Sequence, residues 1–132
     1  ITEEALLHDG ARARAVLAAL RSTGVRVSID DYGSGYSSLS YLRELIVDEV
    51  KLDKSFVLPM ADDPSAAAIV RSTIDLAHAL GLQIVAEGVE DARIAELLTD
   101  YGCDTAQGYL WTRPLPADGL RRWLEGHDTV AR

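Results

Sequence analysis

A pattern that recurs along the chain constrains its fold more than any other feature. A helix-like segment ends at a glycine, a short apolar strand follows, and a polar side chain closes the unit. Glycine directly after a helix is an expected stop signal, because it adopts positive φ angles at no steric cost. The three units of this kind run from Gly24 to Asp30-Asp31, from Gly81 to Glu87 and from Gly102 to Gln107. A fourth unit, 46–53, lacks the glycine and ends in Lys51 and Asp53.

Strands that alternate with helices at this rhythm predict βα units and a mostly parallel sheet. The polar groups stand where each strand ends, and active sites of such sheets form at the carboxyl ends of the strands. Lys51 and Asp53 are two residues apart, so we expect both side chains on one face of their strand. The sequence therefore predicts an α/β fold of four βα units with a site at one edge of the sheet.

The adjacent carboxylates of Asp30 and Asp31 are the most distinctive of these groups. They follow an apolar-rich strand and precede a loop that contains Gly33 and Gly35. Two neighbouring carboxylates repel each other unless a positive charge lies between them, which favours a divalent metal. A solvated Asp-Asp turn is the alternative, because Asp and Gly are ordinary turn residues. The recurrence of polar groups at the other strand ends favours the metal site.

The hydrophobic pattern predicts five helices and four strands. We expect helices over 5–21, from Ser37 or Ser38 to Leu45, over 66–80, from Asp91 to a point before Gly102, and over 117–125. We expect strands over 25–30, 49–52, 82–86 and 105–107.

Composition limits the partners of the chain. Its 132 residues are 48% hydrophobic, which suffices for one domain with a core. The formal net charge of −8 argues against nucleic-acid polymers and anionic membranes, although a metal can still reverse the local field for a small phosphate ligand. No apolar run reaches the length of a membrane span, so no membrane insertion is expected. The single Cys103 favours a reducing, cytoplasmic setting.

Taken together, the motifs resemble one family, the EAL-domain phosphodiesterases that hydrolyse the bacterial second messenger cyclic di-GMP. The matching segments are Asp30 to Leu39, Val50 to Phe56, Ala86 to Glu90, and Gln107 to Leu110 with Pro114-Leu115-Pro116. They occur in the family's order and spacing. The resemblance spans essentially the whole chain, and Ile1-Thr2-Glu3 resembles the end of the family's Glu-x-Thr-Glu motif.

The resemblance implies a (β/α)8 TIM-type barrel with two Mg²⁺ or Mn²⁺ ions at its C-terminal face. With four of the eight strands, residues 1–132 would form a partial EAL domain, the C-terminal half of the barrel. The Glu-Ala-Leu signature and an Asn ligand would then precede Ile1.

By position in the family, Asp30 would bridge the two ions, and Asp31 and Glu87 would complete the shell of the second ion. Lys51 would hold or polarise the attacking water, and Glu87 is the other candidate for the general base. Lys51 could instead only pair with Asp53. Glu87 could also be a first-turn helix carboxylate favoured by the macrodipole.

The resemblance implies substrate contacts for Asp53, Glu90 and Gln107, with Asp53 also pairing with Lys51. Glu3 would anchor the loop 30–38. Glu90 has the same helix-terminus alternative as Glu87, and a buried Gln107 amide could simply satisfy backbone groups.

The implied function is that of a fragment of a phosphodiesterase that opens cyclic di-GMP to linear pGpG. The isolated fragment is expected to be inactive, because its ions would lack part of their shells. A non-catalytic EAL domain that binds cyclic di-GMP or a protein partner is the alternative. Open sheet edges also predict self-association, or association with the missing half of the barrel.

Overall fold

The structure is a computed structural model, and it describes residues 1, 10–33 and 46–127. The α-helices are α2 (Gly10–Ser22), α4 (Lys54–Val57), α5 (Pro64–Ala79), α6 (Ala92–Asp100) and α7 (Ala117–His127), and a 3-10 helix η1 spans Leu58–Ala61. The strands are β1 (Ser28–Tyr32), β2 (Glu49–Leu52), β3 (Gln83–Ala86) and β4 (Thr105–Ala106). The helix predicted from Ser37 or Ser38 to Leu45 and the anchoring role of Glu3 lie outside the described residues.

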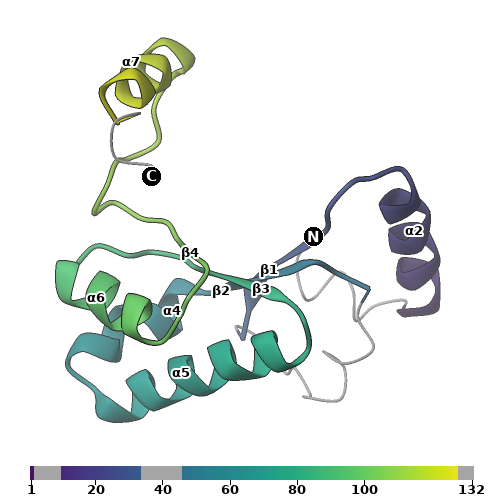
Figure 1. Ribbon diagram of the computed structural model, residues 1–132, viewed down its shortest axis with the longest axis horizontal. Coiled ribbons are helices and arrows are strands. Elements are labelled where there is room, and N and C mark those ends of the chain that lie inside the picture. Colours follow the sequence, from purple (N-terminus) through teal and green to yellow (C-terminus); the bar gives the residue numbers. More distant parts are fainter. Residues whose placement is uncertain (2–9, 34–45, 128–132) are drawn as a thin grey trace.

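The four strands form one sheet in the order β1-β2-β3-β4, and every neighbouring pair is parallel. Figure 1 shows α4, α5 and α6 together on one side of this sheet, with α2 and α7 at opposite ends of the molecule. Consecutive parallel strands joined by helical crossovers are the arrangement that the recurring pattern predicts. The predicted α/β fold with a parallel sheet is confirmed.

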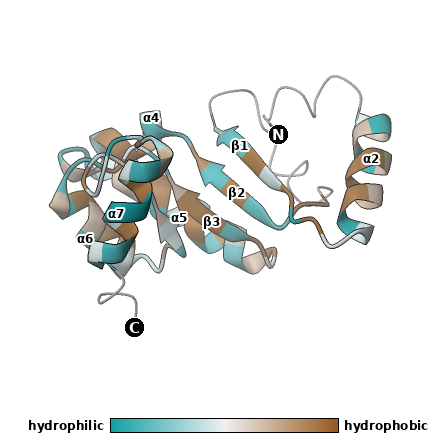
Figure 2. Cartoon of the chain, turned by 90° about the horizontal axis from the view of Figure 1, so that it is seen from above, coloured by the Kyte–Doolittle hydropathy of each residue, from teal (hydrophilic) through white to brown (hydrophobic). Residues whose placement is uncertain are grey.

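An apolar row across the sheet forms the centre of the core. Ile29, Val50 and Ile84 are register partners on β1, β2 and β3, and each is at most 1% exposed. Helix α5 covers the sheet with Val70 and Ile74, both fully buried. Figure 2 shows the corresponding apolar segments in brown along the strands and α5. Burial of a side chain of this size stabilises a fold by about 1.5–3 kcal/mol.

The two faces of the sheet differ in chemistry. In β2, Val50 and Leu52 are buried against the helices, whereas Glu49 and Lys51 are only partly buried. This alternation follows from the two-residue period of a strand. Polar groups of the strands therefore collect on the face that the helices do not cover.

Two of the predicted elements are displaced. The first strand is Ser28–Tyr32 rather than 25–30, because the segment before it is held by a different contact: the Val27 amide donates to the Asp48 carboxylate at 2.8 Å. Asp31, which the predicted strand 25–30 left outside, consequently lies inside the strand together with Asp30. Helix α5 begins at Pro64, two residues before the predicted start, because the carboxylate of Asp63 accepts a hydrogen bond from the Ser65 amide.

The helical segment from α4 to η1 was not predicted. Asp53 caps α4 by accepting a hydrogen bond from the Ser55 amide at 2.9 Å, and Pro59 lies at the start of η1. Both helices are four residues long, so no hydrophobic period marks them in the sequence. No helix in residues 1, 10–33 and 46–127 has both the length and the apolar character that a membrane span requires.

Asp48 joins three segments at the amino-terminal edge of the sheet. Its carboxylate accepts hydrogen bonds from the Val27 amide and, at 2.7 Å, from the Arg21 guanidinium at the end of α2. The Val27 amide, with help from Arg21, holds the pKa of Asp48 below its usual value despite partial desolvation. A lowered carboxyl pKa contributes stability above the unfolded-state pKa, and this contribution is lost as the pH falls through the folded-state pKa.

Replacing Asp48 by Asn should lower the free energy of unfolding at pH 7 by about 1–2 kcal/mol, since the Val27 and Arg21 donors lose their charged acceptor. The difference from the native protein should shrink as the pH falls below about 4. Urea unfolding of the full-length protein between pH 7 and pH 2.5 measures both effects. Asp75→Asn, an exposed carboxylate on α5, is the control and should change stability little. A deficit for Asp48→Asn that is independent of pH would contradict this account.

Candidate metal centre

A β-bulge shapes the end of β1. Ile29 pairs with Val50 and Tyr32 pairs with Leu52, so two residues of β1, Asp30 and Asp31, face the single Lys51 of β2. Asp31 has a φ of 57°, in the left-handed region that residues with a side chain rarely adopt. Neighbouring side chains of a regular strand point to opposite faces. The bulge instead brings both carboxylates to one site.

Glu87 completes this cluster of acidic groups from the end of β3. One carboxylate oxygen from each of Asp30, Asp31 and Glu87 lies within 4.8 Å of the other two. The Glu87 amide donates to the Leu52 carbonyl at 3.1 Å, which extends the pairing of β2 and β3 by one residue. The Glu87 side chain is only 16% exposed. The cluster therefore occupies the carboxyl ends of β1 and β3, on either side of β2, as predicted.

Lys51 neutralises part of this negative charge. Its Nζ donates to Asp30 Oδ1 at 3.1 Å and forms an ion pair with Glu87 Oε1. Burial alone would lower the pKa of Lys51, but the hydrogen bonds and charges of Glu87 and Asp30 outweigh it and raise the pKa above the usual value. Lys51 is thus an ammonium group that donates hydrogen bonds at neutral pH.

The network continues to the last strand. Gln107 follows β4 directly, and its Nε2 donates to Glu87 Oε1 at 3.0 Å. Asp30, Lys51, Glu87 and Gln107 therefore form a chain of polar contacts across the ends of all four strands. In this contact the Gln107 amide bonds a site carboxylate and not only backbone groups.

Two expectations about neighbouring carboxylates are wrong. Asp53 does not pair with Lys51, because the chain leaves the strand at Asp53 and its carboxylate caps α4 through Ser55. The helix-terminus alternative for Glu87 and Glu90 also fails, because α6 is capped by Asp91 and has no acidic residue in its first turn. Both glutamates belong to the segment between β3 and α6.

A pocket of about 360 Å³ opens beside the cluster. Its lining residues are Asp31, Asp53, Lys54, Glu87, Gly88, Glu90, Gln107, Gly108 and Tyr109. All seven site residues predicted within the described ranges therefore meet in one place, since Asp30 and Lys51 adjoin the pocket through Glu87. Their individual roles stay predictions.

The donor set of the cluster suits a hard divalent cation. Carboxylate oxygens are the ligands that Mg²⁺ and Mn²⁺ prefer, and three of them converge here. The ammonium of Lys51 already contacts two of these carboxylates, which demonstrates that the position attracts positive charge. The described residues thus fit a metal ion, which Asp30, Asp31 and Glu87 would hold.

Sequence reasoning missed the close backbone contacts that position the site. A Cβ atom on Gly88 would lie 2.5 Å from the Cβ of Lys54, and a Cβ on Gly108 would lie 2.1 Å from the carbonyl oxygen of Val89. The backbone at Gly108 approaches Val89 because the Val89 amide donates to the Gln107 carbonyl at 3.1 Å. A glycine directly after Glu87 and another after Gln107 were the available signal.

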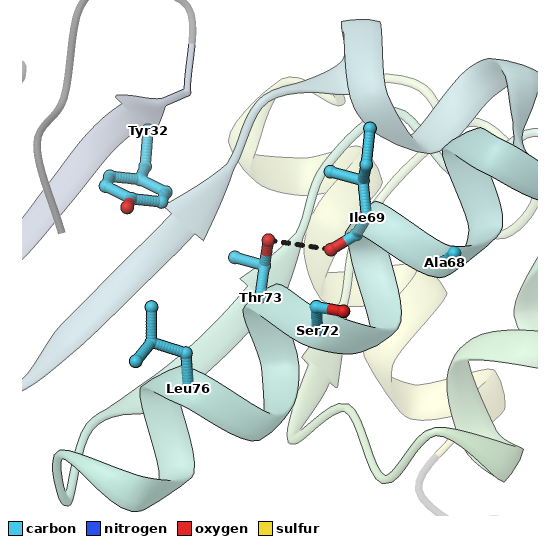
Figure 3. Close-up of a pocket in the computed structure, with 6 residues that line it drawn as sticks. All are labelled: Tyr32, Ala68, Ile69, Ser72, Thr73 and Leu76. Carbon is cyan, nitrogen blue, oxygen red and sulfur yellow. Dashed lines mark hydrogen bonds between the residues drawn. The ribbon is translucent and has the colours of Figure 1, made fainter.

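A second hollow lies along α5, away from the carboxylates. It has a volume of about 430 Å³, and Tyr32, Ala68, Ile69, Ser72, Thr73 and Leu76 line it (Figure 3). The Thr73 hydroxyl donates back to the Ile69 carbonyl at 2.8 Å. These lining residues include no carboxylate, imidazole or thiol, so the metal-binding chemistry belongs to the strand ends.

Comparison with known proteins assigns the chain to a family. A profile of the EAL domain matches residues 1–114. The chain belongs to the EAL domain family. MucR of Pseudomonas aeruginosa, named a bifunctional diguanylate cyclase and cyclic di-GMP phosphodiesterase, is 44% identical over 120 residues. That match covers 91% of this chain and 18% of MucR.

Solved EAL structures share the fold. A complex of the MucR phosphodiesterase with cyclic di-GMP superposes with a TM-score of 0.84 at 44% identity, covering 91% of this chain and 49% of that structure. The EAL domain of Mycobacterium smegmatis DcpA gives 0.89 at 44% identity, with coverages of 96% and 56%. Klebsiella pneumoniae BlrP1, in a manganese and cyclic di-GMP complex, gives 0.80 at 37% identity, with coverages of 86% and 29%. The chain spans about half of the first two structures, as predicted for part of a TIM-type barrel.

Adding a methyl group at Gly108 should disturb this EAL site through the backbone of Val89. Because the added carbon would overlap the Val89 backbone, Gly108→Ala should lower the free energy of unfolding by about 1–3 kcal/mol and displace Gln107 from Glu87. Urea unfolding of the full-length protein measures the loss. Gly126→Ala is the matched control, since outside the backbone of its own helix the described residues place no atom within 4 Å of the added carbon, and alanine favours the helix. Equal stability of the two variants would contradict the close approach.

Proposed function

We propose that the protein is a phosphodiesterase that hydrolyses cyclic di-GMP to linear pGpG with two divalent cations, Mg²⁺ or Mn²⁺. The observation that carries the proposal is the convergence of Asp30, Asp31 and Glu87 within 4.8 Å at the ends of parallel strands. The name of MucR as a cyclic di-GMP phosphodiesterase and the manganese complex of BlrP1 support the proposal through relatives. We place the activity in the cytoplasm, in keeping with the single Cys103.

The carboxylates divide the task of holding the ions. Asp30, which contacts Lys51, would hold both ions, while Asp31 and Glu87 would hold the second ion. When bound, such ions activate a water molecule and stabilise the charge of the departing oxygen. The chain itself contributes fixed ligands on rigid strand ends, so little reorganisation is needed at the site.

Lys51 and Glu87 would handle the attacking water. The Lys51 ammonium is a hydrogen-bond donor and would orient a water molecule toward the phosphorus. The Glu87 carboxylate would accept the proton that this water releases. The water oxygen then forms a bond to phosphorus, the bond from phosphorus to the ester oxygen breaks, and the departing oxygen takes up a proton.

The remaining predicted residues would hold the substrate beside this centre. Gln107 would orient Glu87 through its hydrogen bond and present its amide to the nucleotide, and Glu90 would accept hydrogen bonds from a base or sugar at the pocket rim. Asp53 would contact the substrate from its place in the pocket lining, where its capping bond to Ser55 fixes it.

Asp30→Asn tests the proposal in the full-length protein. Removing the central negative charge should weaken Mn²⁺ binding and reduce the turnover of cyclic di-GMP by about 100-fold or more. Chromatography of pGpG measures turnover, calorimetry measures Mn²⁺ affinity, and EDTA should abolish the native activity. Asp91→Asn is the control, because asparagine also caps a helix and Asp91 lies outside the pocket.

Two results would contradict the proposed function. Native turnover that persists in EDTA would exclude the metal chemistry. Tight binding of cyclic di-GMP without turnover in Mg²⁺ or Mn²⁺ would favour the non-catalytic receptor instead.

We also propose that residues 1–132 alone are inactive and self-associate or bind the remainder of the barrel. In the described fold β4 has one unpaired edge, the outer edge of β1 pairs with Ile1, and α7 buries none of its residues. Six large apolar side chains near the C-terminus are 37–52% exposed, namely Tyr109, Leu110, Trp111, Leu115, Leu120 and Leu124.

Light scattering with intact mass tests the self-association of residues 1–132. A well-folded monomer of 14.3 kDa would contradict the association, and cyclic di-GMP turnover comparable with a complete EAL domain would contradict the inactivity.

A further inference from the structure

The pocket beside the carboxylate cluster has an uneven charge. Four of its lining residues are acidic, namely Asp31, Asp53, Glu87 and Glu90. Lys54 is the only basic residue among the described residues that line it. A substrate with two phosphodiester groups brings two negative charges into this space. Metal ions at the cluster would neutralise the charge of one phosphate. The second phosphate would be repelled by carboxylates unless a cation binds it.

The position of Lys54 is fixed from two sides. It is the first residue of α4, directly after the Asp53 cap, so its backbone is set by the start of the helix. Its side-chain stem lies against Gly88, where an added Cβ would come within 2.5 Å of the Lys54 Cβ and 3.7 Å of its Cδ. Gly88 follows Glu87 directly. The stem of Lys54 is therefore held one residue away from a predicted metal ligand.

The Lys54 ammonium group is not committed to another partner within the described part of the chain. Lys51 forms ion pairs with Asp30 and Glu87, whereas Lys54 is exposed and has no carboxylate within ion-pair distance among residues 10–33 and 46–127. Its charge acts on Asp53 only through space. An ammonium on a flexible stem is a suitable point charge for a phosphate oxygen.

We propose that Lys54 binds the second phosphodiester of the cyclic dinucleotide, the one that is not cleaved, and thereby selects substrates with two phosphates. The inference rests on the proposed function and extends it to a residue outside the metal centre. Lys54 lines the same pocket as Gln107, Gly108 and Tyr109. A ligand that is held at the carboxylates and fills this pocket would meet Lys54 as well as these residues.

Lys54→Met and Lys54→Arg in the full-length protein test the role. Methionine keeps an unbranched stem against Gly88 and removes the charge, whereas arginine keeps the charge. For Lys54→Met we expect the Kd for cyclic di-GMP, measured by calorimetry in Ca²⁺, and the KM in Mn²⁺ to rise about 10-fold, with kcat reduced at most about 3-fold. Lys54→Arg should restore the Kd to within about 3-fold of the native value.

Two controls separate a phosphate contact from a general charge effect. Arg71→Met removes one positive charge from α5, where Arg71 lies over the ring of Tyr101, and should leave the Kd unchanged. Bis(p-nitrophenyl) phosphate has a single phosphodiester, so the loss of kcat/KM in Lys54→Met should be about 10-fold smaller for it than for cyclic di-GMP.

The outcomes are distinguishable. An unchanged Kd in Lys54→Met, or equal losses on both substrates, would overturn the role of Lys54 while the proposed function stands. Failure of the native protein to hydrolyse cyclic di-GMP would overturn the proposed function, and the Kd in Ca²⁺ would still decide whether Lys54 binds the ligand.

Discussion

The contact of one ammonium with two carboxylates organises the functional end of this structure. Lys51 lies on β2, and its partners Asp30 and Glu87 come from the strands on either side, so one side chain connects the ends of three strands. Gln107 adds the fourth strand through Glu87. Carboxylates this close would otherwise repel one another in a half-buried site. The ammonium group thus allows acidic side chains to converge on a stable sheet.

The bulge in β1 supplies the geometry that this charge balance then stabilises. Asp31 adopts a left-handed conformation, which costs free energy for a residue with a side chain. Ile29 precedes the bulge in β1 and belongs to the buried row with Val50 and Ile84. The regular part of the sheet therefore fixes the irregular end of the strand. Strain of this kind is typical of functional positions. In this structure the strained conformation has a clear consequence, because it lets two consecutive carboxylates face the same site.

The sequence predicted the order of the elements, the parallel sheet and the strand ends that carry the site, because hydrophobic period and glycine stops are local signals. It failed where one residue's environment depends on distant contacts. The start of β1 is displaced because Val27 binds Asp48, and Asp53 caps a helix too short to leave a hydrophobic period. The bulge at Asp31 and the close approach of Gly108 to Val89 are tertiary features that composition does not encode.

Because of the extra residue in β1, the length of this strand decides how many carboxylates face the site. Deleting either Asp30 or Asp31 would leave one residue opposite Lys51 and restore uninterrupted pairing between Ile29 and Tyr32. The sheet would gain regularity and lose one carboxylate of the cluster in the same event. A single insertion or deletion at this point would therefore change the acidic cluster while the rest of the sheet keeps its register.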